Sequence, residues 1–216
     1  MPDTPLPREF YDRDALTVAR ELLGMRLVRA SREGVTSGRI VETEAYRATD
    51  DPANHGHRGK TRRNASMFGP PGHAYVYAIH ARHCFNVVTE GVGVASAVLI
   101  RAVEPERGEP LMFRRRGMDK RLNLTSGPAK LCEAFAVDRA IDTWDLTQAR
   151  RLWVTADGAV TRCDADVVTT TRIGVSSGED LPLRFYVAAS PFVSRRAKGG
   201  VGADTRAGSG KTATKH

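Results

Sequence analysis

The chain has 216 residues, of which 41% are hydrophobic and 27% are charged, and its formal net charge is +8. This length favours one large domain, and the composition is typical of a globular protein. Because no apolar run is long enough to span a membrane and the N-terminus lacks the layout of a signal peptide, we expect an intracellular, cytoplasmic protein without a membrane partner, nucleoid-associated if its source is prokaryotic.

The predicted elements form runs of strands interrupted by a few helices. The sequence predicts a helix over 14–23, where leucine and alanine recur on one face and Gly24 follows as a natural stop. Strands are predicted, in chain order, over 25–30, 38–46, 74–80, 84–89, 95–103, 151–155, 167–173 and 183–188. A basic segment over 111–121 is expected to form a helix and then a surface loop, and Ser126 is expected to cap a further helix. Strands in runs, with helices that do not strictly alternate, predict an α+β fold.

Two basic segments stand apart from these elements. Residues 47–73 form a long loop with almost no aliphatic side chains, and such a loop in a compact domain is usually functional or disordered. The end of the chain, 195–216, holds six basic residues and one acidic residue, and it cannot bury a core. We therefore expect a folded domain over 1–194 and a disordered basic tail over 195–216. Both segments suit a phosphate backbone, although a basic face can also serve solubility alone.

The cysteines and histidines give little support to a metal centre. Cys84, Cys132 and Cys163 are odd in number and lack C-x-x-C spacing, so we expect a reduced protein without a cysteine-built zinc site. The histidines at 55, 57, 80 and 83 could be combined into a ligand set, which leaves a metal-dependent nucleic-acid hydrolase open as an alternative. Their spacing matches no strong metal motif, so we predict no metal and no cofactor.

The strand predicted over 38–46 carries two acids on one face, Glu42 and Glu44. Acidic residues are depleted in strands, so this face is an edge wetted by solvent, or it forms a salt bridge to Arg39, or it carries a functional pair. Arg101 lies in a strongly apolar strand, where it must be at the end of the strand or buried and paired. Glu44 is a plausible partner, and the two groups could hold a water molecule as a nucleophile.

Tyr75 and Tyr77 also share one strand face, and this pair has two interpretations. Such a pair belongs more often to the core, with its hydroxyl groups satisfied. Near a basic loop, however, aromatic rings also form stacking walls for a nucleic-acid base, especially an electron-poor or cationic one.

Taken in order, these residues resemble the 3-methyladenine (alkyladenine) DNA glycosylase family, mammalian type, over residues 7–194. The motifs that carry the resemblance are Arg8-Glu-Phe-Tyr, Ala19-Arg-Glu-Leu-Leu-Gly, Gly38-Arg-Ile-Val-Glu-Thr-Glu-Ala-Tyr, Asn54-His, Arg63-Asn-Ala-Ser-Met-Phe, Pro71-Gly, Tyr75-Val-Tyr, Cys84-Phe-Asn, Leu99-Ile-Arg-Ala-Val-Glu-Pro, Ser126-Gly-Pro-Ala-Lys-Leu-Cys, Arg172-Ile-Gly-Val and Leu183-Arg-Phe-Tyr. Each motif is short, but all of them in this order form a highly specific signal. The resemblance implies a single domain with a curved, mostly antiparallel sheet, surrounding helices, and a long loop and a hairpin that face DNA.

The resemblance also implies an activity and a partner. Members of this family turn a damaged purine out of the duplex into a pocket, where a water molecule displaces the base from its sugar without a metal. The implied enzyme is monofunctional, so it leaves an abasic site and does not cut the strand. The implied partner is double-stranded DNA containing damaged purines, and the protein is expected to be a monomer.

Site residues carry over by position in the motifs. Glu44 matches the general base, and Arg101 matches the arginine that helps to place the water. The base-binding residues implied by the resemblance are Tyr46, His55 and Tyr77, which sandwich and hydrogen-bond the base, Asn86, which helps to reject normal guanine, and Ile173, which offers a backbone carbonyl. The residues expected to contact the rest of the DNA are His80, Arg82, Arg58, Lys60, Arg62 and Arg63.

The chain departs from the family pattern at the predicted hairpin. The family usually has a tyrosine or another wedge at the position of His80, and the segment around it is one residue shorter here. His80 or Arg82 could substitute as a shorter, cationic wedge. A nucleic-acid-binding module of the same fold with weak or lost catalysis is therefore a second hypothesis.

Overall fold

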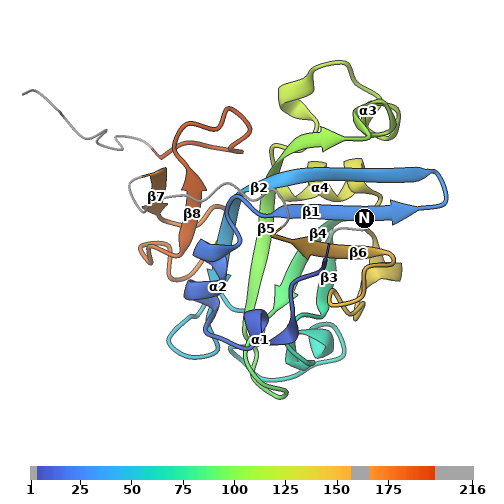
Figure 1. Cartoon of the computed structure of the whole chain (residues 1–216). Coiled ribbons are helices and arrows are strands. Elements are labelled where there is room, and N and C mark those ends of the chain that lie inside the picture. Colours follow the sequence, from blue (N-terminus) through green and yellow to red (C-terminus); the bar gives the residue numbers. More distant parts are fainter. Residues whose placement is uncertain (1–3, 157–165, 198–216) are drawn as a thin grey trace, which may run out of the picture.

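The computed structural model describes residues 4–156 and 166–197, and within them one sheet organises the chain. Its strands are β1 (Arg26–Ser31), β2 (Gly34–Tyr46), β3 (Ala74–Ile79), β4 (Arg82–Val88), β5 (Ala97–Arg107), β6 (Leu152–Thr155), β7 (Val167–Thr170) and β8 (Arg184–Val187). They follow the order β3-β4-β5-β2-β1-β6, while β8 pairs with both β2 and β7 (Figure 1). The helices are α1 (Arg8–Tyr11), α2 (Ala15–Glu21), α3 (Glu109–Arg116) and α4 (Pro128–Phe135), and the 3-10 turns are η1 (Ala65–Phe68), η2 (Arg121–Asn123) and η3 (Arg139–Ile141). The prediction of a single α+β domain on a mostly antiparallel, curled sheet is confirmed.

Strand β2 lies in the interior of the sheet over most of its length, including the segment with Glu42 and Glu44. Its first half pairs with β1 and its second half, around Glu42–Glu44, pairs with β8. On the other side, β5 pairs with β2 from Ser37 to Tyr46, with register shifts on both sides of Glu42. The acidic segment is therefore not on an edge, and the interpretation of a solvent-wetted edge strand is wrong.

One face of β2 packs on helix α2. The hydroxyl group of Thr43 donates to the carbonyl of Ala19 at 2.8 Å, and Val41 and Ala19 are fully buried there. The helix has an acidic N-cap, because the carboxylate of Asp14 accepts a hydrogen bond from Thr17 N at 2.9 Å. With this face of the strand filled by the core, the alternating residues of β2 project from the opposite face.

Some predicted boundaries are wrong for identifiable reasons. Gly127 and not Ser126 is the N-cap of α4, because this position has φ 146°, which favours glycine. The Ser126 hydroxyl group instead accepts a hydrogen bond from Lys130 at 3.3 Å. Strand β5 continues to Arg107, beyond the predicted end, because its last residues still pair with β2. Strand β7 ends at Thr170, so residues 171–173 lie in the loop that follows it.

The β3–β4 hairpin closes with a two-residue turn. Ile79 pairs with Arg82, and between them His80 and Ala81 both have positive φ, 47° and 62°. This is the primed turn geometry that matches strand twist, but it normally uses Asn or Gly, so each residue costs about 1 kcal/mol of backbone strain. The hairpin tip is therefore short and stiff.

The ends of the described chain bear on two further expectations. Arg195 and Arg196 are described and anchored: the Arg195 carbonyl accepts from Arg184 at 2.8 Å, and Arg196 donates to the carbonyls of Ala188 and Ser190. The rest of the predicted tail and Cys163 lie outside the described residues, whereas Cys84 and Cys132 are free, buried thiols. Over the residues with a described structure, no helix has both the length and the apolar character needed to cross a bilayer.

Candidate active site

Both acids of β2 are fully buried and both contact the same arginine. Glu42 and Glu44 have no exposed surface, and Arg101, on the neighbouring strand β5, is 5% exposed. The Arg101 Nε atom lies 3.0 Å from Glu42 Oε1, and its terminal NH1 atom lies 3.0 Å from Glu44 Oε1. Burial lowers the pKa of Arg101, but the two carboxylates outweigh burial and raise it, so the guanidinium stays charged. The predicted pairing of Arg101 with Glu44 is therefore present.

Glu44 is held by three protein donors. Besides Arg101, its Oε1 atom accepts from the backbone N–H of Ile173 at 2.8 Å, and its Oε2 atom accepts from the Tyr46 hydroxyl group at 2.9 Å. A carboxylate offers about four lone-pair positions, so one position on Oε2 remains for a further donor such as water. The contact of Ile173 with Glu44 is through its N–H group, and the role implied for its carbonyl stays a prediction.

Glu42 fixes the arginine from the other side. Its Oε1 atom accepts from Arg101, from Arg184 on β8 at 2.9 Å and from the Ser194 hydroxyl group at 2.9 Å. Its Oε2 atom accepts from the backbone N–H of Ser194 at 2.7 Å. Glu42 thereby ties strands β5 and β8 and the segment around Ser194 together behind Glu44. The contact of Ser194 with Glu42 could not be predicted, because nothing in the sequence distinguishes Ser194 from the other serines.

Aromatic rings stand beside the carboxylate. The centroid of the His55 ring lies 4.6 Å from that of Tyr77 and 6.1 Å from that of Tyr75, and the two tyrosine rings are 5.4 Å apart. His55 Nδ1 is 2.8 Å from the Tyr75 hydroxyl group. Partial burial of the ring lowers the pKa of His55 and favours the neutral form, although the residue as a whole stays exposed. Burial and the nearby Glu44 raise the pKa of Tyr46, so its hydroxyl group remains a hydrogen-bond donor. The predicted base-binding residues Tyr46, His55 and Tyr77 are therefore brought together, and Tyr75 joins them.

An open cavity of about 490 Å³ lies against these rings. Its lining includes Tyr46, His55, Tyr77, Arg101 and Ile173 together with Pro52, Ala53, Asn54, Ile79, Cys84, Leu99, Pro128, Gly174, Val175 and Ser176. Glu44 itself does not reach this surface, but Tyr46, Arg101 and Ile173 line the cavity and each of them contacts Glu44. The carboxylate thus lies one residue beneath the cavity wall.

Asn86 lies away from the main cavity. It lines a narrower recess with Tyr46, His55, Met67, Tyr75 and Tyr77, where there is room for about 10 Å³, close to the volume needed by a single water. Its side-chain amide donates to the Tyr75 carbonyl at 3.0 Å. The structure therefore places Asn86 behind the aromatic wall, and its expected part in rejecting guanine stays a prediction.

A buried ion pair supports Tyr46 and was not foreseen from the sequence. Arg172 and Asp51 have fully buried side chains, 2.6 Å apart at their closest atoms, and the Arg172 guanidinium lies 4.7 Å from the centre of the Tyr46 ring. Asp51 also accepts from the backbone N–H groups of Arg47 and Ala53. This pair fixes the start of the 47–73 loop against Tyr46. Asp51 and Arg172 are 121 positions apart in the sequence, so no local pattern predicts that they form an ion pair.

The residues predicted to contact DNA lie outside the cavity. Arg58, Lys60, Arg62 and Arg63 are all exposed on the 47–73 loop, where Lys60 lies 5.8 Å from the Phe68 ring centre. His80 and Arg82 are exposed at the hairpin tip. Beside them Ile79 is 46% exposed and also lines the cavity, so an apolar side chain stands at its mouth. Ile79 was not predicted as a site residue, because in the sequence it continues the strand face of Tyr75 and Tyr77.

The histidines do not form the ligand set considered above. Throughout 4–156 and 166–197, no group of three or more His, Cys, Asp or Glu side chains has an arrangement that could hold a metal ion. His55 instead contacts Tyr75 and Tyr77, and His80 lies in the exposed hairpin turn.

Comparison with known proteins gives a consistent result. A family model described as Methylpurine-DNA glycosylase (MPG) matches residues 9–191. A "Putative 3-methyladenine DNA glycosylase" of Carboxydothermus hydrogenoformans is 50% identical over 192 residues, which cover 88% of this chain and 99% of that protein. Proteins of the same name from Methanoculleus marisnigri and Methanocella arvoryzae are each 47% identical, covering 88% and 91% of this chain and 99% and 98% of their own lengths. These relatives are bacterial and archaeal, so they support the family and not its mammalian type.

Proposed function

The chain belongs to the methylpurine-DNA glycosylase family, and we propose that it hydrolyses the N-glycosidic bond of alkylated purines, 3-methyladenine first, in double-stranded DNA. The observation that carries this proposal is the buried Glu44 held by Arg101 directly beneath a ring-walled cavity. In this proposal a damaged purine leaves the base stack and enters the cavity, and its departure leaves an abasic site.

Glu44 has two roles in the proposed reaction. Cleaving the bond between base and sugar builds positive charge on the sugar, and a buried carboxylate stabilises that charge through its field. The same carboxylate takes a proton from the attacking water, because that water can donate a hydrogen bond to the remaining lone pair on Oε2. Arg101, Ile173 N–H and Tyr46 hold the carboxylate in one orientation, so little reorganisation is needed during the reaction.

Selection of the damaged base follows from the rings and from the base itself. Alkylation makes a purine a better leaving group, and its cationic or electron-poor ring stacks well on Tyr77 and His55. The neutral His55 adds no repelling charge to this wall. A damaged pair also costs less to unstack, so part of the selectivity arises before the base reaches the cavity.

The proposed enzyme releases the base and leaves the DNA strand intact. No lysine is among the residues that line the cavity in the described part of the chain, so a covalent Schiff base and strand cleavage are not expected. We propose a monofunctional, monomeric, cytoplasmic enzyme whose exposed arginines and Lys60 on the 47–73 loop contact DNA phosphates.

The test of the proposed function is base release. The purified full chain is incubated with alkylated duplex DNA, and the free bases and the abasic sites are quantified separately, with and without a strong chelator. Release of 3-methyladenine that is insensitive to the chelator, with intact strands, is expected. Saturable binding of lesion DNA without release would favour the second hypothesis, a DNA-binding module with weak or lost catalysis. The observation behind that hypothesis is the short hairpin turn at His80.

Ile79 is expected to contribute to binding of the lesion duplex. Because Ile79 is 46% exposed at the cavity mouth, its insertion beside a vacated base position would bury about half of an isoleucine. Replacing Ile79 with serine should weaken binding of a lesion duplex by about fivefold, corresponding to about 1 kcal/mol. Fluorescence anisotropy with a lesion duplex measures this. The matched control is Val92→Ser, at a residue that is 72% exposed and does not line the cavity; equal losses in both variants would contradict the prediction.

A further inference from the structure

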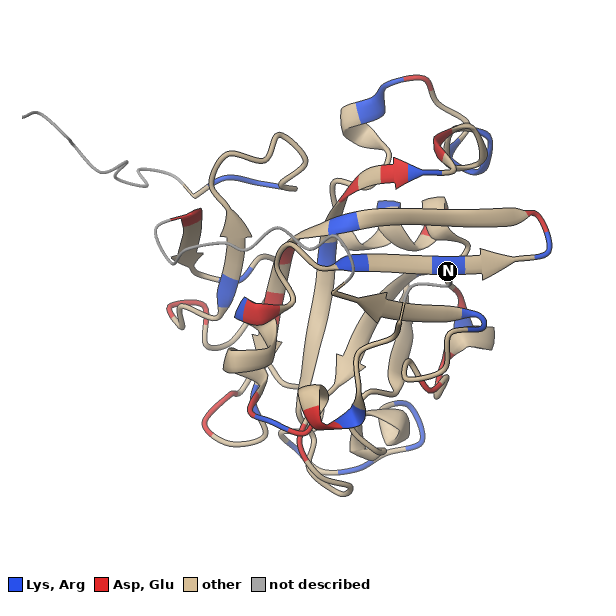
Figure 2. Ribbon diagram, viewed as in Figure 1, with Lys and Arg blue, Asp and Glu red and all other residues tan. Residues whose placement is uncertain are grey.

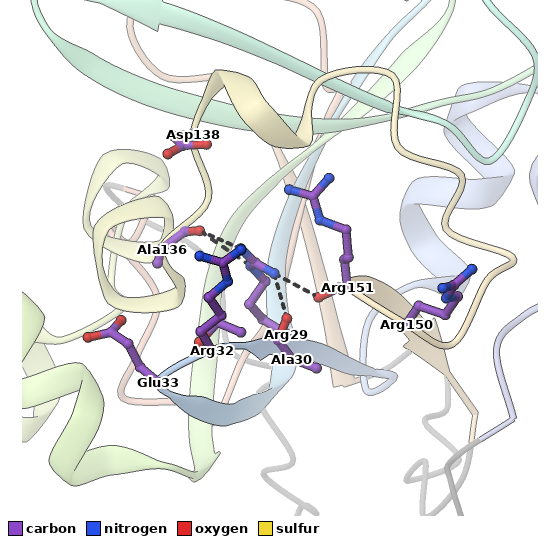
Figure 3. A pocket seen from close by; sticks show the side chains of 9 residues that line it. Arg29, Ala30, Arg32, Glu33, Ala136, Asp138, Arg150 and Arg151 are labelled. Carbon is purple, nitrogen blue, oxygen red and sulfur yellow. Dashed lines mark hydrogen bonds between the residues drawn. The ribbon is translucent and has the colours of Figure 1, made fainter.

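A second pocket lies at the far end of the β1–β2 hairpin. It has a volume of about 700 Å³, and its lining is Arg29, Ala30, Ser31, Arg32, Glu33, Ala136, Asp138, Arg150 and Arg151 (Figure 3). None of these residues lines the cavity near Glu44. Because Glu44 lies ten residues along β2 from Gly34, the two sites are separated by up to about 33 Å at the usual rise of a strand. The pocket is therefore separate from the candidate active site.

Three segments that are distant in sequence bring the arginines of this pocket together. Strand β1 pairs with β6 so that Arg29 is opposite Leu152, which places Arg150 and Arg151 beside the end of β1. Figure 2 shows basic segments at the turn between β1 and β2 and at the start of β6, at the same edge of the molecule. The end of α4, at Ala136, closes the third side.

Arg29 is a buried cation without a carboxylate partner. It is 9% exposed, and its guanidinium donates to the carbonyls of Ala136 at 3.2 Å, Ala30 at 2.6 Å and Arg151 at 3.1 Å. Within the described residues no carboxylate lies within ion-pair distance of it. Burial, and then the charges of Arg151 and Arg115, lower the pKa of Arg29. The carbonyls thus satisfy its hydrogen bonds, but the surplus of positive charge around it remains.

The other arginines keep donors for a ligand, and the two acids of the lining are already engaged. Arg32 and Arg150 are exposed, and their guanidinium groups have no partner among the residues that the structure describes. Arg151 uses one terminal nitrogen to donate to the Ala140 carbonyl at 3.1 Å and keeps its other donors. Glu33 accepts from Arg114 at 3.0 Å and from Arg115 at 2.9 Å. The Asp138 carboxylate caps η3 through the Ala140 N–H at 2.9 Å.

We propose that this pocket binds a phosphate group. Arginine forks recognise phosphate oxygens through paired, charge-assisted hydrogen bonds. Figure 3 shows Arg32 and Arg151 near Arg29, and Arg150 lines the far side of the same pocket, so an anion in it would meet positive charge from more than one side. The phosphate can belong to the DNA backbone far from the damaged base or to a small phosphorylated compound. The chemistry of recognition is the same, and the two sources are separated by experiment. The proposal does not depend on glycosylase activity.

The first arm of the test uses inorganic phosphate and the full chain. Phosphate replaces chloride at constant ionic strength, and binding is followed by calorimetry for the wild type and for Arg32→Gln/Arg150→Gln. If a small phosphate is the ligand, binding is saturable and the double variant weakens it at least about tenfold, since two charge-assisted bonds are lost. The control Arg107→Gln/Lys120→Gln removes the same charge from exposed residues outside the pocket and should bind like the wild type.

The second arm uses DNA. Binding to duplexes of about 12 and about 30 base pairs with a central lesion is measured over a range of salt concentrations, because only the longer duplex extends about 33 Å from the lesion. If a backbone phosphate occupies the pocket, the slope of log K against log salt falls by about 2 in Arg32→Gln/Arg150→Gln on the longer duplex and is unchanged on the shorter one. The proposal is overturned if this variant matches its charge control in both arms. Because both readouts are binding, failure of base release would not affect them.

Discussion

Replacing Glu44 with glutamine is expected to lower the rate of 3-methyladenine release from alkylated duplex DNA by about 10²- to 10⁴-fold, the usual contribution of a general base. Glutamine keeps the length of the side chain and an oxygen that can accept from Ile173 N–H or from Tyr46. It loses the negative charge beneath the cavity and cannot take a proton from water. The chemical step should therefore fail while the shape of the cavity is retained.

Single-turnover base release at saturating enzyme measures this effect without a contribution from product release. Binding of a lesion duplex by the variant, followed in parallel, shows whether the protein is still folded. Glu9→Gln, at an exposed residue of α1, is the control for loss of one carboxylate and should act like the wild type. A folded Glu44→Gln protein that releases base within about tenfold of the wild-type rate would remove Glu44 from the role of general base.

Much of the fold could be predicted because periodic patterns are local. The helix at Asp14 has both an apolar face and a side-chain cap, and the structure contains both. The predicted boundaries were wrong where a strand's end depends on its pairing partner. Strand β5 extends to Arg107 because β2 continues beside it, and the local sequence does not show this pairing. The prediction of Ser126 as the N-cap was wrong, because the preference for serine at N-caps does not take into account the backbone conformation that Gly127 adopts.

The candidate site was predictable only in part. A carboxylate in a strand and an arginine in an apolar strand each required an explanation, so Glu44 and Arg101 were linked by the cost of burying charge. The ion pair of Asp51 and Arg172 could not be predicted in this way, because both residues lie in polar loops, where charged residues are common. The arginine-lined pocket was invisible for the same reason, since Arg29 and Arg151 meet only after β1 and β6 pair.

The charges behind the cavity are balanced. Two carboxylates, Glu42 and Glu44, face two guanidiniums, Arg101 and Arg184, and all four side chains are almost fully buried. Burial of this many ionic groups costs more than an apolar core of equal volume, so stability alone does not explain it. The arrangement instead holds one carboxylate ionised and immobile beneath the cavity, as the proposed reaction requires.

Replacing Arg101 with methionine should therefore lower the free energy of unfolding by about 3–5 kcal/mol, because it leaves two buried carboxylates with one arginine. The double variant Arg101→Met/Glu44→Gln should be more stable than the single variant, because the buried pair of Glu42 and Arg184, 2.9 Å apart, then remains without an extra carboxylate. Lysine at position 101 would keep the charge but not the two-sided contact with Glu42 and Glu44, so an intermediate loss is expected.

Urea unfolding with linear extrapolation measures these differences. Arg107→Met, at an exposed arginine at the end of β5, is the matched control and should stay within about 0.5 kcal/mol of the wild type. If Arg101→Met costs less than about 1 kcal/mol, the charges must be screened by water, contrary to a dry site. If the double variant is no more stable than Arg101→Met, Glu44 does not carry an unbalanced charge in the single variant, and the cost arises from packing of the arginine side chain instead. Recovery of stability in the double variant would show that charge balance, and not the volume of the Arg101 side chain, determines this part of the free energy of unfolding.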